Sequence, residues 1–257
     1  MTDTQRLERP CGNPIQFLIW AGDYTSSSGG CVALHRLAHN LAALGHDARL
    51  SCARTASGWL GKPFPSGCHD QANTIAVYPE IIEGNPWCCG RVVRWILNTP
   101  GFFGPGNGDG VYGERDLIMQ WSADYPVDPK YKVGGLLTAF RDYSQFKDLR
   151  WRRMGTCYAV RKGKQQGHAI DQHGPYSLCI DDYAKLGGDD YLINVFNERE
   201  AFICYDTASM LPILAALCGC PTVGRPAPEV LCAQLAEMIT ASGPQTDAFV
   251  ELCRRQW

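Results

Sequence analysis

The sequence has no long apolar run and no large excess of charge of either sign. No stretch approaches the roughly 18 consecutive apolar residues that a membrane-spanning helix requires, and residues 1–14 lack the apolar core of a signal peptide. The formal net charge of -2 over 257 residues argues against a general nucleic-acid-binding protein. We therefore expect a cytoplasmic globular protein with no transmembrane segment and no specific nucleic-acid partner.

The spacings of common metal and dinucleotide sites are also absent. The cysteine pairs at 88–89 and 218–220 lack the paired two-residue spacing of zinc ligands, so we expect reduced cysteines that pack as small apolar residues. His35 and His39 are four residues apart, but no third ligand accompanies them, and no metal site is predicted. No G-x-G-x-x-G follows the first apolar run, which argues against a dinucleotide-binding dehydrogenase.

What the sequence does contain is an alternation of strand and helix patterns. The apolar run 15–20, "IQFLIW", predicts a strand, and the loop "TSSSGG" follows it. Leucine and alanine then recur at helical spacing in residues 31–45, with Gly45 at the position where a helix ends. Residues 47–53 predict a second strand, which completes a β-α-β unit.

The middle of the chain adds further predicted elements. Residues 74–80 and 116–122 predict strands, and residues 91–98, "RVVRWILN", predict a helix ended by a Pro-Gly pair. The stretch 99–115 is so rich in glycine that we predict a mobile loop.

A second alternating series follows a basic stretch. Its predicted elements are strands within 155–164, 176–181 and 201–206, a helix over 190–198, an apolar helix that starts after residue 206 and leads into another strand, and a short C-terminal amphipathic helix. Two such series predict the α/β class, with two Rossmann-like three-layer domains facing each other across a cleft. The expected parts are a polar tail at 1–13, domains at 14–149 and 150–243, and a C-terminal helix at 244–257.

Three loops follow predicted strands, where ligands of parallel sheets bind. In the first loop, Gly29 and Gly30 allow backbone to approach a ligand phosphate, although a tight turn would also use these glycines. In the second loop, Arg161, Lys162 and Lys164 suit a diphosphate, with a solvated basic turn as the alternative.

The third loop contains Asp206, Thr207 and Ser209 ahead of the apolar helix. Helix capping alone explains one such residue, and three of them predict a ligand at a helix end whose N–H groups are unpaired.

Several stretches together resemble one enzyme family. They are "SSSGGCVALHRLAHNLAALGH", "VRWILNTPG", "AVRKGK" and above all "NVFNEREAFICYDTASMLPILAALCGCPTV". They look like the nucleotide-sugar-dependent glycosyltransferases of the GT-B fold, especially bacterial and phage enzymes of surface-polysaccharide biosynthesis. The resemblance covers most of residues 14–226.

The resemblance implies transfer of a sugar from a nucleotide-sugar donor to a glycan or other hydroxyl acceptor, with no metal and no further cofactor. The donor diphosphate would meet Arg161 and Lys162, and the sugar and phosphate would meet Asp206, Thr207 and Ser209. Many retaining members carry two glutamates eight positions apart, and Asp206 and Leu214 stand there instead. Because leucine accepts no hydrogen bond, the alternative is a degenerate member that binds a nucleotide or glycan without turnover.

Transfer also needs a group that accepts the proton of the acceptor hydroxyl. Asp23, just past the first predicted strand, is the first candidate base, and His35 is the second. The alternatives are a turn carboxylate and a helix-surface imidazole.

Overall fold

The chain folds into two compact α/β units in the computed structural model, which describes residues 14–64, 71–102 and 112–257. Unit 1 comprises Met1–Tyr24, Gly30–Arg141 and Ala241–Trp257, and unit 2 comprises Thr25–Gly29 and Asp142–Thr240. The expected α/β class is confirmed. The predicted polar tail and most of the predicted mobile loop, residues 103–111, lie outside the described residues.

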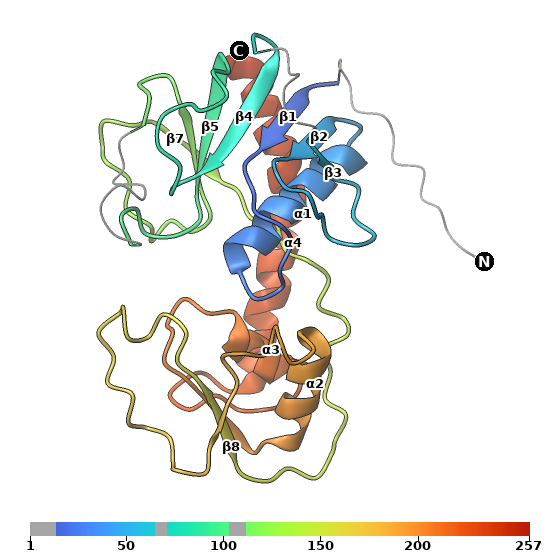
Figure 1. Cartoon of the computed structure of the whole chain (residues 1–257), viewed down its shortest axis with the longest axis vertical. Helices are drawn as coiled ribbons and strands as arrows, with labels where there is room; N and C mark the ends of the chain where they lie inside the picture. The colour runs from blue at the N-terminus through green and yellow to red at the C-terminus, as the bar shows by residue number, and fades with distance from the viewer. Residues whose placement is uncertain (1–13, 65–70, 103–111) are drawn as a thin grey trace, which may run out of the picture. The chain divides into compact units, whose positions relative to one another are not determined.

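Unit 1 contains a seven-stranded parallel sheet that is Rossmann-like (Figure 1). Its strands, in spatial order, are β3 (Lys62–Pro63), β2 (Asp47–Leu50), β1 (Gln16–Ile19), β4 (Thr74–Pro79), β5 (Arg91–Ile96), β6 (Leu117–Gln120) and β7 (Val133–Leu136). The predicted strands at 15–20, 47–53, 74–80 and 116–122 are confirmed. The direction of strand addition reverses between β1 and β4, which makes their carboxyl ends the switch point of the sheet.

The predicted helix at 91–98 is wrong, because these residues form β5. This strand pairs with β4 on one side and β6 on the other, and all of its residues after Arg91 are buried. A strand buried on both faces loses the polar alternation that marks an exposed sheet, so a short apolar run of this kind does not distinguish strand from helix.

Helix α1 (Gly29–Ala43) confirms the predicted first helix and is followed by the turn at Gly45, whose φ of 87° is left-handed. Apolar side chains of α1 share one core with Phe17, Val93 and Trp95 of the sheet. The opposite face of the sheet packs against loop residues such as Trp87 and Tyr131. In the residues that the structure describes, loops therefore replace the second helix layer that the sequence predicts.

Handedness explains this arrangement. A crossover between parallel strands is right-handed in nearly all proteins, so connections that move from β1 to β2 and from β4 to β6 must lie on opposite faces. The connections after β4, β5 and β6 contain no helix in their described residues, which leaves their face of the sheet to loops.

Helix α4 (Pro228–Gln256) is longer than the predicted C-terminal helix, which was expected to begin at residue 244. Pro244 lies inside it. Its end joins the core of unit 1 through Phe249, Val250 and Cys253. The pair Gly243-Pro244 would by itself predict a helix boundary. Burial of the side chains after this pair stabilises the helix and allows it to continue.

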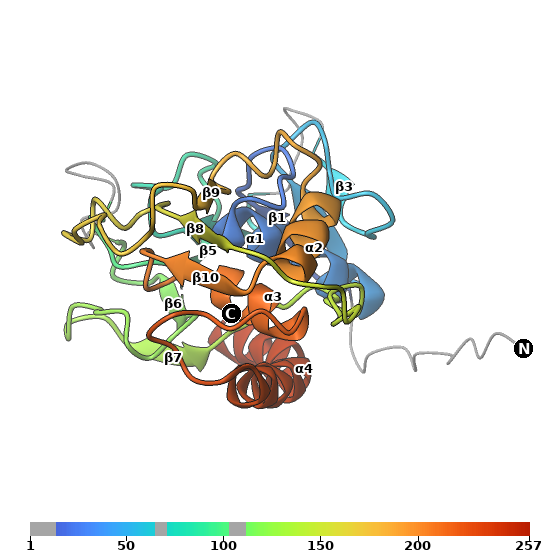
Figure 2. The same cartoon turned by 90° about the horizontal axis from the view of Figure 1, so that it is seen from below.

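Unit 2 is built on a smaller parallel sheet, whose strands lie side by side in Figure 2. The order is β10 (Ala201–Cys204), β8 (Thr156–Ala159) and β9 (Leu178–Cys179), with helices α2 (Asp189–Glu198) and α3 (Leu211–Leu217). These elements confirm the predicted second series. The strand expected after α3 is reduced to one bridge between Phe202 and Thr222.

Among the described residues, none of the helices has both the length and the apolar character needed to cross a lipid bilayer.

Candidate functional site

The loops that follow β8 and β10 meet at the carboxyl edge of the unit 2 sheet, and Gln166 joins them. Its side-chain Nε2 donates to Asp206 Oδ1 at 3.1 Å, and its Oε1 accepts from the backbone N–H of Thr207 at 3.0 Å. The Thr207 hydroxyl also donates to Oε1, at 3.3 Å. One amide group therefore holds together the two loops that contain the predicted donor-binding residues. Sequence analysis did not identify Gln166, because a glutamine in a polar loop carries no distinguishing pattern.

Arg161 is held in place by backbone and aromatic contacts. Its φ of 47° is left-handed, and its backbone N–H donates to Asp181 Oδ1 at 3.2 Å. Its guanidinium donates to the carbonyl of Ser27 and lies 5.6 Å from the ring centroid of Tyr183. No carboxylate forms an ion pair with Arg161 in the described part of the chain, so this positive charge is not neutralised there.

The other basic residues of this loop lie beside Arg161. Lys164 is exposed and Lys162 is partly buried. Gly163 between them is required by packing, since a Cβ at this position would lie 2.6 Å from Cβ of Tyr205. The loop after β8 therefore packs directly on the residue that precedes Asp206.

Tyr205 anchors a third loop to the same edge. Its side chain is 4% exposed, and its hydroxyl accepts from the backbone N–H of Gln172 at 2.7 Å. His173 Nδ1 lies 2.8 Å from the same hydroxyl, and the His173 ring stacks on Tyr158 with centroids 3.6 Å apart. Buried hydrogen bonds of this kind fix loop positions and give the edge a defined shape.

Asp206 and Ser209 shape the third predicted loop by local hydrogen bonds. Asp206 is 4% exposed, and its Oδ1 also accepts from the N–H of Ala208 at 3.0 Å. Ser209 Oγ accepts from the N–H of Leu211, the first residue of α3, at 3.2 Å. Ser209 thus contributes to the capping that the alternative interpretation described.

The N–H groups at the start of α3 are paired, contrary to the expectation from the sequence. Leu211 donates to Ser209, and Ile213 and Leu214 both donate to the carbonyl of Met210. Pro212 has no N–H. The prediction that this helix end offers unpaired donors is therefore wrong for these residues.

Asp23 follows β1 in unit 1 and forms a turn with residues after β2. Its Oδ1 accepts from the N–H groups of Ala53 and Arg54 at 3.0 and 2.9 Å, and its Oδ2 accepts from Arg54 Nε at 2.9 Å. These bonds to Arg54 and Ala53 lower the pKa of Asp23 below its usual value. A carboxylate with a lowered pKa is a weaker general base, which agrees better with a structural turn.

His35 is buried beneath the same turn, with 1% exposure. Its Nε2 lies 2.9 Å from the carbonyl of Gly22 and 3.9 Å from Cys52 Sγ, and its Nδ1 has no hydrogen-bond partner among the described residues. Burial lowers the pKa of His35. The imidazole therefore favours the neutral form, but it is too deeply buried to contact an acceptor hydroxyl at the surface.

His35 and His39, which are four residues apart in the sequence, make separate contacts. His39 Nδ1 accepts from the N–H of Leu60 at 3.1 Å, away from the Gly22 contact of His35. Within residues 14–64, 71–102 and 112–257, no group of three or more His, Cys, Asp or Glu side chains is arranged to hold a metal ion.

Gly29 and Gly30 start α1 and have space around them. A Cβ at Gly29 would meet nothing within 4 Å, and a Cβ at Gly30 would meet Leu97 at an ordinary 3.7 Å. Neither glycine has a positive φ, so the fold does not require glycine at either position. The interpretation of these residues as a tight turn that packing demands is not supported.

Comparisons with protein-family models and with curated proteins found no match to this chain. The candidate site is therefore defined by its own geometry: a basic loop and a polar loop, joined by Gln166 at the carboxyl edge of a parallel sheet.

Proposed function

We propose that this chain is a glycosyltransferase that transfers a sugar from a nucleotide-sugar donor to a hydroxyl acceptor, in the GT-B arrangement of two Rossmann-like domains. Unit 2 would bind the donor and unit 1 the acceptor. The observation that carries the proposal is the meeting of the basic loop with the Asp206 loop at the carboxyl edge of the unit 2 sheet. Ligands of open parallel sheets bind at this edge.

The charge of Arg161 suits the donor diphosphate. A guanidinium binds phosphate oxygens through paired N–H donors, and its attraction is largest where no carboxylate competes. Arg161 has no such competitor in the described residues, and exposed Lys164 adds a second cation. As the bond between sugar and phosphate breaks, the departing nucleoside diphosphate gains negative charge that these side chains would stabilise.

The remaining polar groups of the edge would orient the sugar. Asp206 Oδ1 is already occupied by Gln166 and Ala208, which leaves Oδ2 as the acceptor for a sugar hydroxyl. Thr207 would contribute its hydroxyl. The acceptor hydroxyl would lose its proton as its oxygen bonds to the sugar carbon, and Asp23 is the proposed base. The proposal carries with it a cytoplasmic location, as the sequence predicts.

A second candidate function is binding of a nucleotide or glycan without turnover. Leu214, at the position of the second family glutamate, is 4% exposed and apolar, so it offers no hydrogen bond to a ribose. The lowered pKa of Asp23, caused by Arg54 and Ala53, also favours this candidate because it weakens the proposed base.

Calorimetric titration of nucleoside diphosphates and nucleotide sugars tests the donor site. The double variant Arg161→Ala/Lys162→Ala should bind at least about tenfold more weakly than the parent, a loss of about 1.4 kcal/mol. Arg152→Ala, an exposed arginine before the amino end of β8, is the matched control and should bind like the parent. Equal affinity in the parent and the double variant would refute the diphosphate assignment.

The variant Asp206→Asn distinguishes the proposed glycosyltransferase from the second candidate, a protein that binds its ligand without turnover. The amide oxygen can still accept from Gln166 and Ala208, so the melting temperature should stay nearly unchanged. Donor hydrolysis or transfer should fall at least about tenfold if Asp206 acts on the sugar. A parent that binds a nucleotide sugar but never turns it over supports the second candidate.

A further inference from the structure

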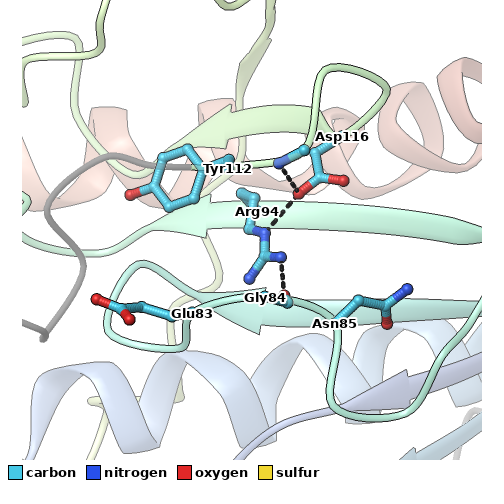
Figure 3. Close-up of a pocket in the computed structure, with 7 residues that line it drawn as sticks. Glu83, Gly84, Asn85, Arg94, Tyr112 and Asp116 are labelled. Atoms are coloured by element: carbon cyan, nitrogen blue, oxygen red, sulfur yellow. Dashed lines mark hydrogen bonds and ion pairs between the residues drawn. The ribbon is translucent and has the colours of Figure 1, made fainter.

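A pocket of about 550 Å³ lies on unit 1, on the sheet face opposite α1 (Figure 3). Seven residues line it: Glu83, Gly84, Asn85, Arg94, Tyr112, Gly113 and Asp116. Its volume falls within the range of about 300–1,000 Å³ that small-molecule sites occupy. None of these residues belongs to the loops of unit 2 described above.

Arg94 forms a rigid wall of the pocket. The side chain is 1% exposed, and its Nε donates to Asp116 Oδ2 at 2.7 Å. Its other nitrogens donate to the carbonyls of Ile82, at 2.6 Å, and Gly84. The guanidinium also lies 5.5 Å from the ring centroid of Tyr112. Figure 3 shows Arg94 between the segment of Glu83 to Asn85 and the segment of Tyr112 to Asp116.

The charges of the lining disfavour anions and give cations little advantage. Asp116 neutralises Arg94 through their ion pair, and Glu83 is exposed and makes no hydrogen bond or ion pair with described residues. An anion would meet the unpaired carboxylate of Glu83, and because Glu83 is exposed, solvent screens its attraction for a cation. A neutral ligand avoids the repulsion.

Hydrogen-bond acceptors dominate the lining. Both oxygens of Glu83 and Oδ1 of Asp116 have no partner among the described residues, because Arg94 and Gly113 both donate to Asp116 Oδ2. Ionised carboxylates only accept hydrogen bonds, so a complementary ligand must donate them. The buried hydroxyl of Tyr112 also lacks a partner among described residues, which leaves a polar group of the lining unsatisfied.

We propose that this pocket binds a neutral, hydroxyl-rich ligand, a monosaccharide unit, whose hydroxyl groups donate to Glu83 and Asp116. Sugar hydroxyls supply several donors within one small neutral molecule, which matches an acceptor-rich lining with little net charge. The inference does not depend on glycosyl transfer, since it uses only residues of unit 1.

Nuclear magnetic resonance titration of the full chain tests the site. The probes are glucose, galactose and N-acetylglucosamine as neutral sugars, with glucosamine and glucose 6-phosphate as charged relatives. We expect saturable shifts at the amides of Gly84 and Gly113 with at least one neutral sugar, weaker binding of glucose 6-phosphate and no tighter binding of glucosamine. Glu83→Gln should weaken binding about fivefold, because a charged acceptor becomes a neutral one.

The matched control is Glu114→Gln, which removes an exposed carboxylate that does not line the pocket. It should bind the sugar like the parent. Absence of saturable shifts with all three neutral sugars would overturn the proposal, as would tighter binding of a charged relative or unchanged affinity in Glu83→Gln. Glu83 is exposed, so its variant should fold and the result stays interpretable.

Discussion

Two arginines, one in each unit, show how the same side chain serves different purposes. Arg94 lies on a central strand with 1% exposure and pairs with Asp116. Arg161 lies on a loop, and its guanidinium donates to a backbone carbonyl and forms no ion pair with a carboxylate in the described part of the chain. Both guanidiniums lie against tyrosine rings, at 4.9 Å from Tyr78 and 5.6 Å from Tyr183. The comparison indicates that a buried arginine whose charge is neutralised stabilises the fold, whereas an arginine that is held in place without a neutralising partner is suited to bind an anionic ligand.

Removing the partner of the buried arginine should have the largest effect. Asp116→Ala leaves the Arg94 charge unpaired inside unit 1, and we expect the free energy of unfolding to fall by about 3–5 kcal/mol. Urea unfolding followed by circular dichroism measures the change. Asp182→Ala is the control, because its ion pair with Lys185 is exposed, and it should leave stability unchanged. Similar losses of stability in the two variants would show that burial does not determine how much each ion pair contributes to the free energy of unfolding.

The packing of the basic loop on Tyr205 predicts the next largest effect. Gly163→Ala places a Cβ 2.6 Å from Cβ of Tyr205 and 2.9 Å from two carbonyl oxygens, so stability should fall by about 1–3 kcal/mol. Gly29→Ala has open space and should change it by less than about 0.5 kcal/mol. Denaturant midpoints compare the two, and a tolerated Gly163→Ala would show that this loop is free to shift.

The bridge made by Gln166 should matter more for binding than for stability. Gln166→Ala removes the bonds to Asp206 and Thr207, and we expect a stability loss of about 1 kcal/mol and nucleoside diphosphate binding about tenfold weaker. Thermal melting measures the stability, and calorimetry measures the binding affinity. Gln172→Ala keeps its backbone bond to Tyr205 and serves as the control. If Gln166→Ala binds nucleoside diphosphate like the parent, the bridge between the two loops does not contribute to ligand affinity, and the prediction is wrong.

The smallest effect concerns pH and again distinguishes the units. Burial lowers the pKa of His35, His39 and His46, all in unit 1. The unfolded chain therefore binds these protons more readily, and stability should fall as the pH drops from the ordinary value of 6.5 toward the lowered pKa values, and stay constant above it. Asp23 and Asp47, whose pKa values are lowered by bonds to Arg54 and Arg49, lose their contribution only below 3.8. Urea midpoints above pH 5 that do not change with pH would contradict the histidine assignment.

Sequence patterns predicted the parts of the fold that depend on local chemistry. The first strand, helix α1 with Gly45 at its end, and the alternating elements from β8 to α3 follow from apolar periodicity and turn residues. The same patterns predicted that the loops of Arg161 and Asp206 lie at one edge, because parallel strands place their carboxyl ends together, and Gln166 of the first loop contacts Asp206 there. These features need only neighbours along the chain or a general rule of sheets.

Other features required the tertiary structure. Residues 91–98 are apolar enough for helix or strand, and pairing of β5 with two neighbours decides between them. Helix α4 continues through Pro244 because its end packs against the unit 1 sheet. Gln166 and Arg94 gain their roles from partners distant in the sequence, at positions 206 and 116. The amino-acid sequence thus determined the alternation, the helix end and the positions of the basic and polar loops, whereas hydrogen bonds and packing between distant segments decided the pairing of strands, the layers of the sheet and the partner of each charge.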